Sequence, residues 1–259
     1  ELFIKYQILF FYFYFLGRSI VFFTSYYYLK EKNIPDTIFF VNSKIVYPII
    51  GIVFLGNFLL IANFFLPLKN IFVLIFMILL IIPNIFFTNF NISNLIKFEN
   101  IFNYLIIPLV LLISSFDILF HYDAGYYHLN NQNWIYESNI VLGFVNIFWA
   151  FGMSSIYEYI SAFFWFDQSY IFLHLTNLFF VHFFYTYCVE TIFNGKEKLL
   201  KNASLFLLVF SILDNFGLGG GRNGFIYIES MGKQDNAIGI LFFFLSITTF
   251  IYIKNKEIN

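Results

Sequence analysis

Charged side chains are scarce in this sequence. Only 11% of its 259 residues are Asp, Glu, Lys or Arg, whereas soluble domains carry about 25%. The net charge of −1 provides no basic surface for nucleic acid. The single cysteine, Cys188, lies in an apolar run, which excludes a disulfide within one chain and disfavours a thiolate metal site. No signal peptide is visible at the first residues.

Long apolar runs make up most of the chain. Hydrophobic residues account for 60% of it and the mean hydropathy is +0.78. About 20 apolar residues are needed to cross about 30 Å of hydrocarbon. We therefore predict an all-α membrane protein with about seven transmembrane helices. The expected spans are 6–29, 45–66, 70–87, 101–120, 170–190, 203–218 and 237–253.

The positions of Lys and Arg predict the orientation, because cytoplasmic loops carry the excess of these residues. The apolar stretch 141–166 is interrupted by Gly152, Ser154, Ser155 and Glu158. If it does not cross, the basic residues outside the spans divide nine against four; if it crosses, they divide seven against six. We therefore predict that 141–166 lies in the outer interface as one or two amphipathic helices. The nine on the cytoplasmic face are Lys30, Lys32, Lys44, Lys97, Lys196, Lys198, Lys201, Lys254 and Lys256, and the four are Lys5, Lys69, Arg222 and Lys233.

The first extracytoplasmic loop begins with "HYDAGYYHLNNQNWIYES", residues 121–138. Asp123 follows a span by a few residues, so partial desolvation at the membrane surface favours its neutral acid and makes its carboxylate more basic. His128 and Tyr127 lie close behind it. These residues are candidates for binding and proton transfer. The alternative interpretation is a solvated loop with an aromatic interface belt.

The second extracytoplasmic loop is "GGGRNGFIYIESMGKQDNA", residues 219–237. A glycine run lets the backbone approach a ligand and present N–H groups to an anion. Arg222 and Lys233 are two of the few cations on this face and are candidates for binding a phosphate. Glu229 and Asp235 add two carboxylates. The alternative is a flexible end of a span.

Two histidines lie inside the fifth expected span, eight residues apart, at His174 and His182, with Glu190 a further eight along. Ionisable groups within a span are functional candidates. A metal relay is one interpretation, and hydrogen-bonded neutral histidines in a helix bundle are the simpler one.

The segment 121–165 resembles an uncharacterised family of bacterial polytopic membrane proteins, in which a Tyr-Asp-(Ala/Thr)-Gly-x-Tyr-His segment precedes Gly-x-x-Asn and Gly-x-x-Ser-Ser. That family is similar in turn to the GT-C superfamily, the membrane glycosyltransferases that use polyprenyl-phosphate sugars. The resemblance covers about residues 115–250. The chain departs from the superfamily because Ala124 follows Asp123 where an acidic pair is common, and because three expected spans precede the motif. The matching residues are Tyr122, Asp123, Gly125, Tyr127, His128, Gly143, Asn146, Gly152, Ser154 and Ser155.

The resemblance implies N-terminal membrane helices over 1–100 and a GT-C-like catalytic core, expected to be truncated, over 101–259. It implies transfer of a sugar from a polyprenyl-phosphate donor to an extracytoplasmic or lipid-linked glycan acceptor, in the bacterial inner membrane and for cell-envelope polysaccharide. Asp123 is the expected catalytic base. The expected substrate-binding residues are Tyr127, His128, Arg222, Glu229, Lys233 and Asp235.

No cofactor or metal is indicated, and the expected partners are the bilayer, the lipid-linked sugar and the acceptor, without nucleic acid. Two alternatives stay open. One is a polysaccharide polymerase or ligase, which a longer Arg-rich outer loop would favour. The other is a non-enzymatic subunit of a respiratory complex from an AT-rich genome, which accounts for the 42 Phe but not for two polar loops on one face.

Overall fold

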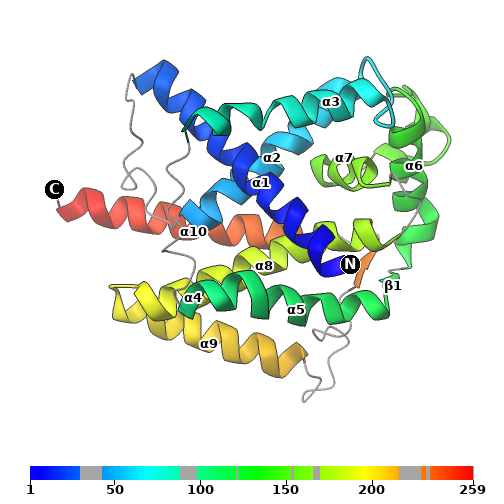
Figure 1. Ribbon diagram of the computed structural model, residues 1–259. Coiled ribbons are helices and arrows are strands. Elements are labelled where there is room, and N and C mark those ends of the chain that lie inside the picture. The colour runs from blue at the N-terminus through cyan, green and yellow to red at the C-terminus, as the bar shows by residue number, and fades with distance from the viewer. Residues whose placement is uncertain are drawn as a thin grey trace.

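The computed structural model describes residues 1–29, 43–87, 98–120, 122–152, 155–165, 170–215, 229–231 and 234–258. Helices make up nearly all of this part of the chain, as the apolar runs predict (Figure 1). The long helices are α1 (Leu2–Thr24), α2 (Ser43–Asn63), α8 (Tyr170–Asn194), α9 (Lys198–Asn215) and α10 (Asp235–Ile258). The shorter α-helices are α3 (Ile71–Leu79), α4 (Phe98–Ile101), α5 (Ile107–Leu112), α6 (Leu129–Glu137) and α7 (Ile156–Phe163).

Short turns of 3₁₀ or π helix and one strand pair complete the described elements. The turns are η1 (Ser25–Leu29), η2 (Ile82–Phe87), η4 (Phe102–Ile106), η5 (Ile113–Phe116), η6 (Ala124–His128), η7 (Phe144–Asn146) and η8 (Trp149–Gly152). The strands are β1 (Leu119–Phe120) and β2 (Glu229–Met231), which pair in parallel.

Five helical segments are long and apolar enough to cross a membrane within the described residues. They are Leu2–Tyr27, Lys44–Asn63, Phe98–Phe116, Tyr170–Asn194 and Asp235–Lys254. Of the seven expected spans, 70–87 forms a shorter apolar helix followed by the 3₁₀ turn η2. Residues 203–215 of the expected span 203–218 lie in α9, which is not among the five, and residues 216–218 lie outside the described residues. The structure thus supports an all-α membrane protein, and the expected spans 70–87 and 203–218 stay predictions.

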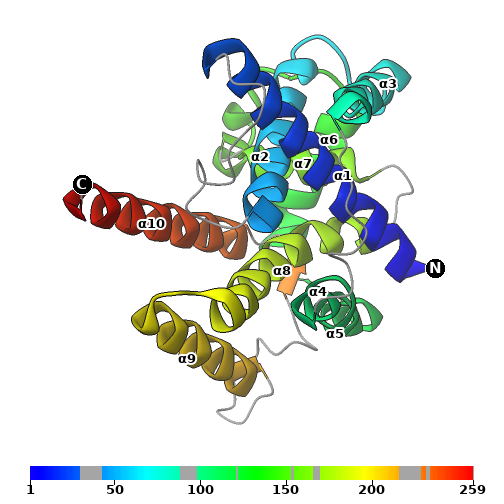
Figure 2. The same cartoon turned by 60° about the vertical axis from the view of Figure 1, so that its left-hand side comes forward.

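Helix α8 is the centre of the bundle, and most of its side chains are buried. Helices α5, α9 and α10 pack against it from different sides, and α1 and α2 pack against one another next to it. Figure 2 shows α10 extending away from α1 and α2, so most of its apolar surface is exposed. An apolar surface of this kind is expected where lipid rather than protein surrounds a helix.

Within the segment 98–116, Pro108 lies in the first turn of α5, directly after the π turn η4. Proline has no N–H, so it leaves the carbonyl of the residue four positions earlier without its helical partner. That residue is Tyr104, and its carbonyl oxygen accepts a hydrogen bond from Gln7 Nε2 of α1 at 2.7 Å. The neighbouring Asn103 carbonyl accepts one from His182 Nε2 of α8 at 2.7 Å. Adjacent helices thus satisfy the backbone groups of the π turn η4, as a bilayer requires.

Helices α1 and α2 approach closely at two glycines. A Cβ atom on Gly17 would lie 1.8 Å from the Tyr47 carbonyl oxygen, and one on Gly51 would lie 2.1 Å from the Phe13 carbonyl oxygen. Small residues allow such contact between backbones of membrane helices. The close contact explains why glycines occur at these two positions.

We expect Gly17→Ala to lower the thermal stability of the detergent-purified protein by about 1–3 kcal/mol, because the new methyl group must push the two backbones apart. Gly239→Ala is the matched control, since nothing lies within 4 Å of its added Cβ. Alanine in a helix interior is favoured over glycine by about 0.8–1 kcal/mol, so the control should not be destabilised. Equal melting temperatures for the two variants would contradict the tight contact.

In its described residues, 141–152 and 155–165, the stretch 141–166 forms no membrane-crossing helix. Its longest helix, α7, has 8 residues and is therefore only about 12 Å long. The rings of Phe120 and Tyr170, which precede and follow the whole region, are 5.1 Å apart. The chain thus returns to the end of the bundle that it left.

Its expected position at the interface fits only one part of it. The turns η7 and η8 expose Ile147 and Trp149, whereas α7 inserts among α2, α6 and α8 and is buried over almost its whole length. Helix α7 carries Tyr159, Ile160 and Phe163 close to Glu158. Residues 158–163 are all buried, and α7 is therefore a core helix rather than an amphipathic surface helix.

The elements of the first polar loop lie at one end of the bundle, which we call the α6 end (Figure 1). It also holds the N-terminus of α1, the α2–α3 connection and the start of α8. The α2–α3 connection is attached to α6 by hydrogen bonds from Leu68 N to Ile135 O and from Lys69 N to Tyr136 O. The opposite end holds the C-termini of α8 and α10 and the start of α4.

Candidate functional site

The two polar loops predicted from the sequence meet at the α6 end. Strand β1 leads directly into the segment with Asp123, and it pairs with β2 from the second loop in the register Leu119 to Glu229 and Phe120 to Met231. Ser155, which precedes α7, also donates a hydrogen bond to Gln234 of the second loop. Segments more than 100 residues apart in sequence therefore share one end of the bundle.

A buried pair of ionisable side chains lies behind this strand pair. His128 ends the π turn η6 and its Nδ1 lies 2.5 Å from Glu158 Oε1 of α7. The other carboxylate oxygen, Oε2, accepts a hydrogen bond from Asn131 Nδ2 on α6. The side chains of His128 and Glu158 are 8% and 1% exposed. An ionised carboxylate can only accept hydrogen bonds, so the Nδ1–H of His128 donates and the lone pair of a neutral ring is on Nε2.

The environment of this pair holds the imidazole in one orientation. A buried carboxylate requires partners, and His128 and Asn131 satisfy one oxygen each. The ring of Tyr127 lies 4.1 Å from the ring of His128, centroid to centroid. No hydrogen bond between described residues uses His128 Nε2. The arrangement, an imidazole oriented by a carboxylate, is the one that enzymes use for proton transfer.

Asp123 lies one turn before His128 and is half-buried. Several effects raise the pKa of Tyr127: first the desolvation of its phenol, then the nearby charges of Asp123 and Glu158, the neighbouring Tyr122, and a side-chain hydrogen bond with Asp123. Because the phenol stays protonated, it donates that hydrogen bond to the Asp123 carboxylate. The structure thus brings Asp123, Tyr127 and His128 together, and their expected roles in binding and proton transfer stay predictions.

The predicted residues of the second loop are described only in part. The backbone of Glu229 lies in β2 beside Leu119, and Asp235 is the exposed first residue of α10. Arg222 and Lys233 lie outside the described residues, as does the glycine run 219–221. Their expected contact with a phosphate therefore stays a prediction.

The sequence indicated Glu158 only as an interruption of an apolar stretch. Its pairing with His128 spans 30 residues and that with Asn131 spans 27. The signal that could have found it is a lone carboxylate in a run of apolar residues, since such a group needs a buried partner. His128 is the nearest preceding residue whose side chain can become positively charged and so pair with this carboxylate.

A second buried polar cluster lies at the opposite end of the bundle. Lys44 Nζ of α2 lies 2.6 Å from Glu190 Oε1 of α8 and 2.6 Å from Asn100 Oδ1 of α4. Asn103 Nδ2 donates to the same carboxylate oxygen at 2.7 Å, and Asn194 Nδ2 donates to Glu190 Oε2 at 3.0 Å. The cluster joins three of the membrane-spanning segments.

The two histidines of α8 are held by hydrogen bonds to other helices. His182 Nε2–H donates to the Asn103 carbonyl, so Nδ1 accepts from the hydroxyl of Tyr6 at 3.0 Å. His174 Nε2 lies 2.8 Å from Ser114 Oγ, whose own hydrogen is donated to Leu111 O. Among the described residues, no group of three or more His, Cys, Asp or Glu side chains is placed to hold a metal ion. The hydrogen-bonded interpretation of these histidines is therefore the one that the described part of the chain supports.

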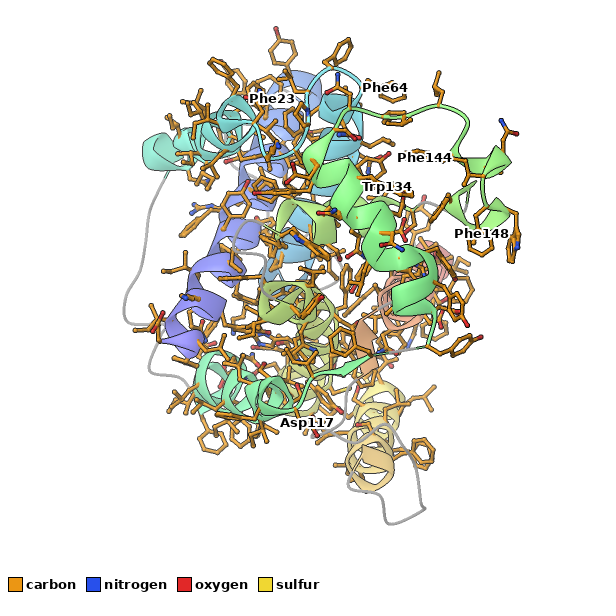
Figure 3. All side chains as sticks on the ribbon, turned by 90° about the vertical axis from the view of Figure 1, so that its right-hand side faces the viewer. Phe23, Phe64, Asp117, Trp134, Phe144 and Phe148 are labelled. Atoms are coloured by element: carbon orange, nitrogen blue, oxygen red, sulfur yellow. The ribbon has the colours of Figure 1, made fainter. Side chains whose placement is uncertain are left out.

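A pocket of about 240 Å³ lies beside the His128–Glu158 pair. Asn131 connects the two, because it both lines the pocket and donates to Glu158. Its lining residues include the amides of Asn131 and Asn139, the hydroxyl of Ser138 and the aromatic side chains of Trp134 and Phe144. Figure 3 shows Trp134 on α6 with Phe144 beside it, and Phe148 farther out on the same loop.

The loop over the pocket keeps its shape through local contacts. Gly143 has φ 91°, a left-handed conformation that other residues rarely adopt. The Trp134 ring lies 4.3 Å from Phe144 and 4.7 Å from Phe151, centroid to centroid. Residues 143–152 are thereby packed onto α6 as a cover.

A bundle of apolar helices with a buried carboxylate–imidazole pair at one end defines a polytopic membrane protein of the all-α class. The chain belongs to the family described as "Domain of unknown function (DUF8201)", whose sequence model matches residues 2–258. No curated protein and no solved structure matches it. The family match runs across the expected domain boundary at residue 100, and α2 packs against α7 across it. The boundary stays a sequence-based prediction.

Proposed function

We propose that this protein is a membrane glycosyltransferase that moves a sugar from a polyprenyl-phosphate donor to an extracytoplasmic or lipid-linked glycan acceptor. The observation that carries the proposal is the position of Asp123–Tyr127 next to the His128–Glu158 pair, at the end where β1 and β2 join the two polar loops. Groups that can accept a proton and donate to an anion lie there within a few residues of each other. Similarity to the GT-C superfamily in the order of these segments supports the same function.

In the proposed reaction, the acceptor hydroxyl oxygen attacks the anomeric carbon of the donor sugar, and the bond from that carbon to the phosphate oxygen breaks. Asp123 takes the hydroxyl proton. The phosphate leaves as an anion without needing a proton. A protonated His128, whose charge Glu158 balances, donates its Nε2–H to a phosphate oxygen and stabilises the developing charge there. Arg222 and Lys233 are expected to add cations to the same phosphate.

The direct experiment places the purified protein in proteoliposomes with a radiolabelled polyprenyl-phosphate hexose and a lipid-linked glycan acceptor. Label should move to the acceptor in a time-dependent way, and vesicles without the protein should show none. Failure across neutral hexose and N-acetylhexosamine donors, with correctly folded protein, would refute the proposal.

We propose further that the α6 end faces the extracytoplasmic side of the bacterial inner membrane, because the predicted cytoplasmic face carries nine of the thirteen basic residues outside the spans. Single cysteines in a Cys188→Ser background test this orientation. In intact cells, an impermeant maleimide should label Ser138→Cys and not Asn194→Cys, and both should be labelled after the membrane is permeabilised. The reverse pattern in intact cells would overturn the orientation.

A further inference from the structure

The pocket under residues 140–152 has a composition that selects its ligand. Of its fifteen lining residues none is Lys, Arg, Asp or Glu. A charged ligand would lose its hydration there without gaining an opposite charge, which is unfavourable. Asn131, Ser138 and Asn139 donate one hydrogen each to Glu158, to the Trp134 carbonyl and to the Phe65 carbonyl. The second N–H of each amide, the amide oxygens and the hydroxyl lone pairs are what they can offer to a ligand. The pocket is therefore suited to a neutral molecule with several hydroxyl or amide groups.

The size and shape of the pocket narrow the class further. Its volume of about 240 Å³ is larger than the cavity of about 150 Å³ that holds one benzene. It is smaller than the roughly 300–1,000 Å³ of pockets for drug-sized molecules. One substituted six-membered ring matches this size. The presence of both polar and aromatic side chains in the lining suits a ring with hydroxyls on its edge and C–H groups on its faces.

The pocket is also connected to the acid–base pair. Asn131 lies between them, since it lines the pocket and donates to Glu158, which accepts from His128. A ring bound in the pocket would therefore be connected through Asn131 and Glu158 to His128, the group that we place at the phosphate. We propose that this pocket binds one uncharged pyranose unit of the glycan substrate, a hexose or N-acetylhexosamine. This inference rests on the proposed function for the role of that sugar, but the binding itself can be measured without any transfer reaction.

Trp134 provides the probe. The chain has three tryptophans, and Trp149→Phe with Trp165→Phe leaves only Trp134, which lines the pocket. The full chain in detergent is titrated with methyl glucoside, methyl mannoside, methyl N-acetylglucosaminide and, as the charged comparison, methyl glucuronide. We expect a saturable change in Trp134 emission with at least one neutral glycoside, and affinity at least about tenfold weaker for the glucuronide because its carboxylate lacks a partner.

Two asparagine variants separate binding in the pocket from binding elsewhere. Asn139→Ala removes a polar group from the lining and should weaken the neutral glycoside about two- to tenfold, the loss expected for one hydrogen bond. Asn133→Ala is the matched control, because Asn133 lies on α6 and is exposed but does not line the pocket. Its affinity should stay unchanged. No saturable response to any neutral glycoside, equal affinity for the glucuronide, or equal behaviour of the two variants would each overturn the inference.

The glycoside titration and the sugar-transfer experiment can fail independently of one another. Saturable binding in the pocket together with no transfer would leave a sugar-binding membrane protein and end the transferase proposal. Transfer that proceeds with an unchanged KM in Asn139→Ala, and without glycoside binding, would keep the transferase and end the pocket assignment.

Discussion

Replacing Asp123 with asparagine is expected to reduce sugar transfer by about 10²–10⁴-fold, the usual loss when a general base is removed. Asparagine has nearly the same shape as aspartate and can still accept the hydrogen bond from Tyr127, but it cannot take the acceptor proton. The loss should therefore appear in kcat, with little change in expression or melting temperature. Initial rates in proteoliposomes at saturating donor and acceptor measure it.

Asp117→Asn is the control for this change. Asp117 is an exposed carboxylate just before β1, at the same end of the bundle, and Figure 3 shows it below the strand. It has no role in the proposed reaction, so its variant should transfer sugar at the unmodified rate. Equal rates for both variants would remove Asp123 from the mechanism. His128 would then be the next candidate for the base, because the Nε2 lone pair of its neutral ring can accept a proton.

Much of the fold follows from the sequence alone because the bilayer imposes a simple rule. An apolar run of about 20 residues must form a helix to satisfy its backbone, and five such segments are confirmed in the described residues. The position of α7 could not be predicted in the same way. Its apolar and aromatic residues suit both an interface and a protein interior. Only its packing on α2, α6 and α8 shows that Glu158 is buried.

The candidate site was predictable where its residues are close in sequence. Asp123, Tyr127 and His128 fall within one short segment, and the structure places them together. Long-range partners carry no such signal. Lys44 and Glu190 are 146 residues apart, and the sequence indicated them only as a basic loop residue and a candidate in a metal relay. Their pairing depends on how α2 and α8 pack, which local patterns do not determine.

That pairing leads to the largest expected effect on stability. Glu190 is 5% exposed and Lys44 is 24% exposed, so the carboxylate has less access to water than the ammonium group. Breaking a buried ion pair by removing one partner costs about 3–5 kcal/mol, mainly because the remaining charge is buried without its counter-ion. Lys44→Met strands the more buried charge, and Glu190→Gln strands the less buried one. The order of destabilisation should therefore be Lys44→Met first and Glu190→Gln second.

Thermal unfolding of the detergent-purified variants measures this order. Lys44→Met is expected to lose about 3–5 kcal/mol, and Glu190→Gln less, since the single amide oxygen of the glutamine can still accept the hydrogen bond of Asn103 or that of Asn194. The double variant Lys44→Met/Glu190→Leu removes both charges and should recover part of the loss, because apolar replacement of a whole buried pair is often neutral. Lys254→Met is the control: its partner Glu197 lies 2.8 Å away and both side chains are largely exposed, so its loss should stay below about 1 kcal/mol.

If Lys44→Met is no less stable than Lys254→Met, the Lys44–Glu190 pair does not join α2 to α8. A double variant that is less stable than either single one would mean that the asparagines, rather than the ion pair, require the polar environment.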